Sequence, residues 1–140
     1  MIRKAQLADA AQAAALMLAL WPHHSIDEMR QEARALLSDP EVLIALCGDH
    51  AFAHCSLRHD YVEGTETSPV GYLEGLYVQP EWRHRGIARA LVDFCADWAK
   101  AQGCREFASD CELDNAGSLA FHLAAGFTEA NRVICFVKKL

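Results

Sequence analysis

The chain has 140 residues, which leaves room for one domain, so we expect residues 1–140 to form a single domain. Hydrophobic residues make up 52% of it and charged residues 23%, a balance too apolar for intrinsic disorder. Thirteen Lys and Arg against nineteen Asp and Glu leave a net charge of −6. General nucleic-acid binding needs a surplus of cations to displace counterions from phosphates, so the charge argues against it and favours a cationic ligand.

Neither a membrane segment nor a metal site is predicted. The longest apolar stretch, residues 13–21, is too short to span a bilayer, and the N-terminal residues lack the continuous core and cleavage site of a signal peptide. The six cysteines include no C-x-x-C pair, and the histidines are not at metal-ligand spacing with them or with acidic clusters. We therefore expect a cytoplasmic protein with reduced, mostly buried cysteines and no metal.

The first half of the chain predicts helices and a hairpin. Ser25 and Glu28 have the spacing of a capping box, in which each side chain bonds the backbone of the other residue at a helix start. In chain order, we expect a strand over 1–5, a helix capped by Asp9 and running to Leu20, a helix from Ser25 to about Leu37, and hairpin strands over 42–47 and 51–59.

The second half predicts a strand that crosses into a helix and returns to a strand. The expected elements are a strand over 70–78, a long helix from Gly86 to Gly103, a strand over 107–110, a helix over 115–125 and a final strand over 133–137. Such a crossover implies a parallel pair at the centre of the sheet, with antiparallel strands beside it. The fold class is therefore α/β (α+β), with a mixed sheet between helices.

The turn after the strand over 70–78 has the pattern of an anion site. A strand ends at Val78, a basic turn with Gly86 follows, and a long helix begins, so free backbone N–H groups and the positive end of the helix dipole converge. Gly86 allows a phosphate close to the main chain, and the arginines at 83, 85 and 89 add countercharge. An ordinary turn with solvated arginines is the alternative.

Two motifs resemble those of the GCN5-related N-acetyltransferases (GNAT). Arg83-x-x-Gly86-x-Ala88 resembles the acetyl-CoA-binding signature of that superfamily, and Asn115-x-x-Ser118-x-x-x-His122-x-x-x-Gly126-Phe127 resembles its second CoA-side motif. Ala88 stands where many members have a glycine. The resemblance implies the GNAT fold, a mixed central sheet whose splayed parallel pair admits acetyl-CoA. The G-x-G-x-x-G spacing of a dinucleotide-binding fold is absent.

The resemblance also implies which residues bind acetyl-CoA. Backbone groups of one strand would bond the pantetheine arm, a turn would cradle the pyrophosphate, and one side chain would face the pantetheine. These residues are Leu76, Tyr77 and Val78 for the strand, Arg83, His84, Arg85, Gly86, Ile87, Ala88 and Arg89 for the turn, and Asn115.

Acidic residues gather just before the basic turn. No Lys or Arg occurs between Arg58 and Arg83, whereas that interval holds several carboxylates. Glu74 is the most informative, because a carboxylate flanked by Leu73 and Leu76 within a strand needs a partner or a task if it is buried. It can otherwise face solvent or form an ion pair.

Several segments resemble the aminoglycoside 6'-N-acetyltransferases. They are Leu20-Trp21-Pro22, Leu57-Arg58-His59-Asp60-Tyr61-Val62, Leu73-Glu74-Gly75 and Ala108-Ser109-Asp110. The resemblance implies a substrate site lined by Trp21, Tyr61, Glu74 and Asp110. It places Asn131 where relatives can carry an acid, and it implies a homodimer in which residues 132–137 pair with a second subunit.

The chemistry that this resemblance implies needs a neutral amine. A carboxylate holds the ammonium group and then takes its proton, directly or through water, and we assign this role to Glu74 with Asp110 as the second carboxylate. A main-chain N–H near Leu76 or Tyr77 would stabilise the charge on the thioester oxygen. His122 would protonate the leaving thiolate, or would only pack against or bond the cofactor.

Two other functions remain open from the sequence. The first keeps the superfamily but changes the acceptor to a polyamine, a peptide N-terminus or a lysine. The second is a non-catalytic acyl-CoA-binding module.

Overall fold

The computed structural model describes residues 1–140 and contains one five-stranded sheet. Its strands, in the order in which they lie side by side, are β1 (Ile2–Lys4), β2 (Val42–Cys47), β3 (Ala51–Arg58), β4 (Val70–Val78) and β5 (Phe107–Ala108). The first four pair antiparallel, and β4 and β5 pair parallel. The predicted mixed sheet with a parallel pair is therefore confirmed. The pair lies at one edge of the sheet and not at its centre as predicted, because no strand follows β5, and β5 is shorter than the predicted strand over 107–110.

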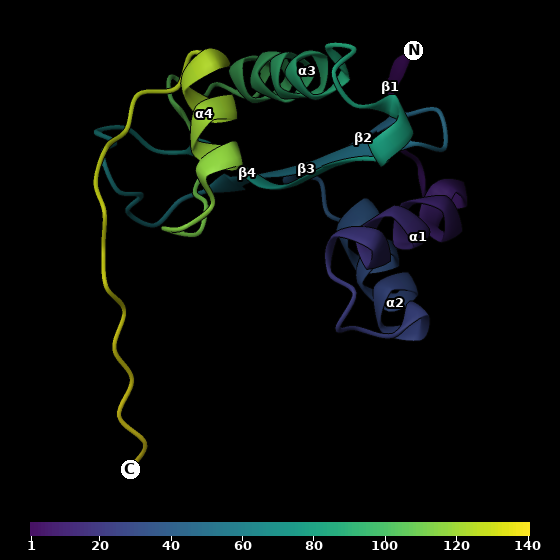
Figure 1. Cartoon of the computed structure of the whole chain (residues 1–140), viewed down its shortest axis with the longest axis horizontal. Coiled ribbons are helices and arrows are strands. Elements are labelled where there is room, and N and C mark those ends of the chain that lie inside the picture. The colour runs from purple at the N-terminus through teal and green to yellow at the C-terminus, as the bar shows by residue number, and fades with distance from the viewer.

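Helices cover both faces of the sheet (Figure 1). The helices α1 (Ala10–Leu20) and α2 (Ile26–Leu37) pack on one face, and α3 (Ile87–Ala101) packs on the other. The fourth helix, α4 (Ala116–Ala124), stands beside α3, and single 3-10 turns occur at Leu7–Asp9 and Pro80–Trp82. No helix combines the length and the apolar character needed to cross a bilayer.

The continuous apolar run of β2 follows from its burial on both faces. Ile44 and Leu46 belong to the core under α1 and α2, whereas Leu43, Ala45 and Cys47 belong to the core under α3. Successive side chains of a strand point to opposite faces, so a strand covered on both sides is apolar throughout.

One of the two predicted helix caps is confirmed. Ser25 accepts a hydrogen bond from the Glu28 N–H (3.1 Å), and Glu28 accepts one from the Ser25 N–H (3.0 Å), which completes the capping box of α2. Asp9 precedes α1, but its carboxylate does not cap that helix. It accepts instead from the Gln6 N–H (2.7 Å) and from the Arg3 guanidinium (2.8 Å), because β1 brings this cation beside it.

The prediction of a final strand over 133–137 is wrong. Residues 127–140 form neither helix nor strand, and the tail leaves the body of the molecule (Figure 1). Phe136 and Val137 are each 90% exposed. A strand exists only where its N–H and C=O groups join a neighbouring strand, and the tail pairs with neither edge strand of the sheet, β1 or β5.

Candidate active site

The parallel strands β4 and β5 separate soon after they meet. Their pairing is limited to Gly71 with Phe107 and Tyr72 with Ala108. From Leu73 to Val78, β4 has β3 on one side and no strand on the other. The N–H and C=O groups that point away from β3 along this stretch have no strand partner. Apart from the Val78 carbonyl, which accepts from the Arg83 Nε, they are available to a ligand. The strand residues predicted to bond acetyl-CoA lie here.

The turn after β4 leaves the amino end of α3 uncapped. Gly86 is the residue before α3, with a left-handed φ of +79°, and no side chain caps the helix. The first helical bond runs from the Ala90 N–H to the Gly86 carbonyl (3.0 Å), so the N–H groups of residues 87–89 have no helical acceptor. A Cβ at Gly86 would meet no atom within 4 Å. Open space thus lies before free donors, which suits a phosphate.

Three arginines lie against this turn. The Arg83 Nε donates to the Val78 carbonyl (2.8 Å), and the Arg85 guanidinium stacks over the Trp82 ring at 4.8 Å. Arg89 donates to the Ala124 carbonyl at the end of α4 (2.9 Å). The predicted cations thus lie in the turn or in the first turn of α3, each held by a different partner.

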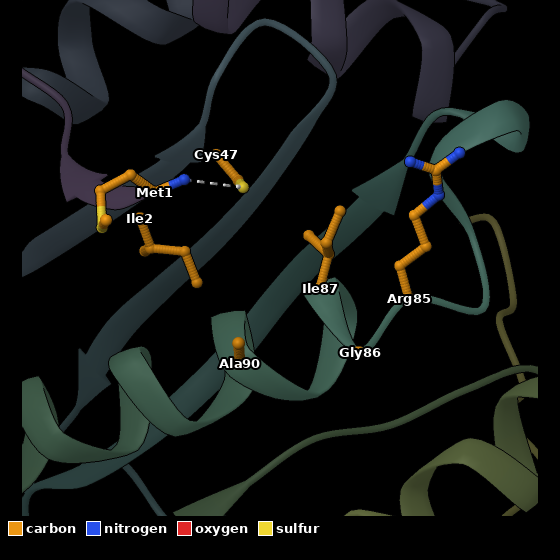
Figure 2. Close-up of a pocket in the computed structure, with 7 residues that line it drawn as sticks. All are labelled: Met1, Ile2, Cys47, Arg85, Gly86, Ile87 and Ala90. Atoms are coloured by element: carbon orange, nitrogen blue, oxygen red, sulfur yellow. Dashed lines mark hydrogen bonds between the residues drawn. The ribbon is translucent and has the colours of Figure 1, made fainter.

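A cavity of about 410 Å³ adjoins the same turn on its other side (Figure 2). It is lined mainly by apolar residues from β1, β2 and the start of α3, namely Met1, Ile2, Cys47, Arg85, Gly86, Ile87 and Ala90. The sheet order places β1 and β2 at the far edge from β5, so this cavity is separate from the gap between β4 and β5. It holds none of the predicted acidic residues.

Glu74 occupies a β-bulge in β4. His54 pairs with Gly75 and Cys55 with Leu73, so the ladder skips Glu74. A bulge re-aims the side chain of the extra residue. The carboxylate accepts from the Ser56 hydroxyl at Oε2 (2.6 Å) and from Arg58 at both oxygens, through Nη2 to Oε1 (2.6 Å) and Nε to Oε2 (3.0 Å). Of the alternatives for Glu74, the structure shows an ion pair.

These bonds keep Glu74 ionised at neutral pH. Burial on its own would raise the pKa of Glu74, but the hydrogen bonds from Arg58 and Ser56 and the charge of Arg58 hold that pKa below its usual value. The side chain is 22% exposed. An ionised, partly accessible carboxylate is suited to receive an ammonium group.

Asp110 is connected to the same cluster through an aromatic ring. The Arg58 guanidinium lies 3.4 Å above the centre of the Tyr72 ring, and the Tyr72 hydroxyl donates to the Asp110 carboxylate. Burial and this bond raise the pKa of Tyr72, so its hydroxyl remains a donor. The structure thus brings both predicted carboxylates to one arginine–tyrosine pair.

The predicted aromatic and amide residues of the site lie in different places. Trp21 follows α1 and packs on β4, because a Cβ at Gly75 would lie 2.7 Å from its ring. Tyr61 is 75% exposed in the loop between β3 and β4. Asn131 donates to Glu63 in that loop (2.7 Å). Trp21 is therefore next to the Glu74 bulge, whereas no bond joins Tyr61 or Asn131 to it.

Two residues of the second motif have bonds within the protein. The Nδ1 of His122 lies 2.7 Å from the Ser118 carbonyl, which only accepts, so Nδ1 carries a proton. In the neutral ring, Nε2 then accepts from the Ser109 hydroxyl (2.8 Å). His122 needs a second proton before it can act as an acid. Asn115 caps α4 by accepting from the Ser118 N–H (3.0 Å).

Sequence reasoning did not identify the partners of the carboxylates. Ser56, Arg58 and Tyr72 were missed as functional residues. A signal for the first two exists, because residues two apart share one face of a strand and the end of β3 alternates polar with apolar side chains. His54 shares this face, and its buried Nδ1 has no hydrogen-bond partner. Burial lowers the pKa of His54 although Glu74 opposes that effect.

Comparisons with known proteins agree with this geometry. The model of the acetyltransferase (GNAT) family matches residues 6–127. The chain is 46% identical over 140 residues to a protein of Stenotrophomonas maltophilia named aminoglycoside N(6')-acetyltransferase type 1, and the match covers 96% of this chain and 90% of the relative.

Two solved structures have the same fold over the whole chain. One is AAC(6')-Iy in complex with the bisubstrate analogue CoA-S-monomethyl-acetylneamine, with a TM-score of 0.92 and 36% identity, covering 100% of this chain and 98% of that one. The other is the aminoglycoside 6'-N-acetyltransferase AAC(6')-Ih from Acinetobacter baumannii, with a TM-score of 0.92 and 41% identity over the same shares.

Proposed function

Because the chain belongs to the acetyltransferase (GNAT) family, we propose that it transfers an acetyl group from acetyl-CoA to the 6'-amine of aminoglycoside antibiotics and so confers resistance to them. The observation that carries this proposal is the 46% identity, across almost the full length, to a relative named for that reaction. The ionised Glu74 beside the open edge of β4 supports it, since the substrate carries ammonium groups.

We assign acetyl-CoA to the β4 edge and the turn after it. The free backbone groups near Leu76, Tyr77 and Val78 would bond the pantetheine arm, and the amides of residues 84–89 would receive the pyrophosphate with countercharge from the arginines. Asn115 keeps an amide N–H₂ group for the pantetheine side while its oxygen caps α4. The uncapped helix end and the open space at Gly86 fit this cosubstrate.

The aminoglycoside would lie against the Glu74 side of the gap. Glu74 and Asp110 would hold ammonium groups, and Trp21 and Tyr61 would pack on sugar faces. Asn131, at the start of the tail, offers an amide where relatives can carry an acid, so it would make a weaker contact with a cation. Asp110 and Tyr61 are exposed and therefore reachable by a large polar substrate.

The proposed mechanism is direct attack of the amine on the thioester. Acetyl-CoA supplies the acetyl group in activated form. Glu74 orients the ammonium group, and its proton leaves to Glu74 or Asp110, directly or through water. A main-chain N–H near Leu76 or Tyr77 donates to the carbonyl oxygen as that atom gains charge. We assign to His122, in its doubly protonated form, the return of a proton to the thiolate.

The test is a thiol-release assay with acetyl-CoA and a panel of aminoglycosides. We expect turnover with kanamycin- and tobramycin-like compounds that carry a 6'-amine and none with congeners that carry a 6'-hydroxyl. Spermidine serves as the competing polycation, and its preferential acetylation would replace the aminoglycoside with a polyamine. Binding of acetyl-CoA without thiol release for any amine would leave a non-catalytic module.

We also propose that the enzyme is a cytoplasmic homodimer. Residues 133–137 are five consecutive apolar residues, and the segment extends away from the body of the molecule (Figure 1). Such a segment gains hydrogen bonds and buries apolar surface when it pairs with the edge of a sheet, and a second copy of the chain offers such an edge. The six free cysteines suit a reducing compartment where acetyl-CoA is made.

A further inference from the structure

Arg58 has more contacts in the candidate site than any assigned role explains. It is the last residue of β3, and its guanidinium bonds both oxygens of Glu74 across the strand pair. The Arg58 side chain is 42% exposed and that of Glu74 is 22% exposed, so both members of the pair remain partly accessible to solvent. The residue proposed to bind the amine is thus already paired with a cation.

The bonds to Glu74 leave little acceptor capacity. A carboxylate offers about four lone-pair positions, two on each oxygen. Ser56 and the Arg58 Nε occupy those of Oε2, and the Arg58 Nη2 occupies one of Oε1. One lone-pair position on Oε1 remains free. Its direction is fixed because the Arg58 guanidinium holds both carboxylate oxygens.

Arg58 is itself held in place. Its guanidinium lies 3.4 Å over the Tyr72 ring, and the Tyr72 hydroxyl bonds Asp110. A planar, stacked and bidentate arginine loses little further freedom when a ligand arrives. The chain Ser56–Glu74–Arg58–Tyr72–Asp110 therefore forms one connected network that links both carboxylates.

We propose that Arg58 is a positioning residue for acetyl transfer, which clamps Glu74 in one orientation and leaves a single acceptor position for the substrate ammonium. This inference rests on the proposed function. In this proposal Glu74 orients the amine nitrogen towards the thioester. The planar, two-point contact of the Arg58 guanidinium, and not its charge alone, fixes the orientation of Glu74. A misplacement of about 1 Å at a reacting group can cost on the order of 100-fold in rate.

The experiment compares Arg58→Lys and Arg58→Gln with the wild type in tobramycin-dependent thiol release. Lysine keeps the charge and loses the bidentate plane. We expect kcat to fall about tenfold or more in both variants, with the KM for acetyl-CoA unchanged. The KM for tobramycin should be unchanged in Arg58→Lys, which keeps the cation, and unchanged or lower in Arg58→Gln, which removes a cation near the substrate. Wild-type kcat in Arg58→Lys would overturn the clamp.

A pH profile separates positioning from a purely structural link. The charged and titratable groups around Glu74 are Arg58, His54 and Cys55 on β3, with Tyr72 and Asp110 beyond the guanidinium, while the end of α1 and the residue after it contribute the uncharged Leu20 and Trp21. Arg58→Gln removes the cation that favours ionised Glu74, so the acidic limb of the pH profile of turnover should move to higher pH in this variant. Arg58→Lys should keep the wild-type limb. Identical limbs in all three proteins would contradict the proposal.

A matched pair elsewhere controls for the loss of an ion pair as such. Arg3 also bonds both oxygens of a carboxylate, that of Asp9, and it lies on β1 at the opposite edge of the sheet. Arg3→Gln should leave kcat unchanged, and melting temperatures confirm folding of each variant. In a Glu74→Gln background, Arg58→Gln should add almost nothing, because its action passes through Glu74. An additive further loss would overturn the proposal. No turnover in the wild type would refute the proposed function instead.

Discussion

For the single residue Glu74, burial and hydrogen bonding have opposite effects on the pKa of the carboxylate. Burial disfavours its charge, whereas Ser56 and Arg58 provide three bonds to the ionised form. The bonds prevail, and the pKa lies below its usual value. The carboxylate is therefore already ionised when a cationic substrate arrives, at the cost of being a weak base.

The first prediction concerns catalysis by this carboxylate. Glu74→Gln keeps the shape of the side chain and removes its charge, so the ammonium loses its partner. We expect kcat/KM for tobramycin to fall by about 100-fold or more, a typical loss for a group that handles a proton. Calorimetric affinity for acetyl-CoA should change little. Equal turnover in the variant would remove Glu74 from the mechanism.

The second prediction concerns stability against pH. The pKa of Glu74 is lower in the folded protein than the value of about 4.3 in an unfolded chain, so its stabilising effect is complete above that value and is lost as the pH falls through the folded pKa. The melting temperature of Glu74→Gln should lie below that of the wild type at pH 7, and the gap should narrow towards pH 3. A gap that widens would contradict the assignment.

Asp9 provides the comparison for that measurement. The Arg3 bond and the Gln6 N–H lower the pKa of Asp9 to about 2. The difference in melting temperature between the wild type and Asp9→Asn should therefore narrow at a lower pH than the difference for Glu74→Gln. Asp9 lies before α1, outside the candidate site, and its variant should keep wild-type turnover.

At the level of elements, the junction of β4 and α3 combines strain with open space. Gly86 has a φ of +79°, which disfavours any side chain, and nothing occupies the position of a Cβ. Packing therefore does not require a glycine here. The requirement comes from the backbone conformation and, in our proposal, from the phosphate that approaches the free amides.

The third prediction separates these two requirements. Gly86→Ala should lose on the order of 1–2 kcal/mol of stability through its left-handed φ, and it should also weaken acetyl-CoA binding by about tenfold or more. Gly103, after the other end of α3, has a φ of +95° and equally open space. Gly103→Ala should show the loss of stability with normal affinity by calorimetry. Equal affinities in both variants would reject a phosphate site at Gly86.

For the chain as a unit, the exposed tail is the feature that a single copy leaves unexplained. Val133, Ile134, Phe136 and Val137 are 66–90% exposed, which is an unusual concentration of apolar surface. The tail begins at Asn131, which is bonded to the loop carrying Tyr61 and Glu63. An exchange of tails between two copies would bury this surface next to the candidate site.

The fourth prediction follows from that arrangement. Removal of residues 132–140 keeps the Asn131 bond and deletes the expected strand, so light scattering should show a monomer where the full chain is a dimer. Removal of 138–140 alone, beyond the strand, should leave the mass unchanged. A full-length monomer at micromolar concentration would refute the homodimer.

The sequence alone was sufficient for features that depend on neighbours in the chain. The capping box of α2, the apolar periodicity of α3 and the glycine turn before it are local, so their residues specify them directly. The order of strands, helix and strand around residues 70–108 likewise implied a parallel pair before any contact was known.

Only the tertiary structure decided which partners the charged residues have and whether residues 133–137 form a strand. Arg58 and Glu74 are 16 positions apart, and Tyr72 and Asp110 are 38 apart. They meet because a bulge shifts the register of β3 against β4 and a crossover brings β5 alongside. Residues 133–137 have the composition of a strand, but a strand must also pair with a sheet edge, and the tail leaves the body without pairing with the edge strands β1 or β5.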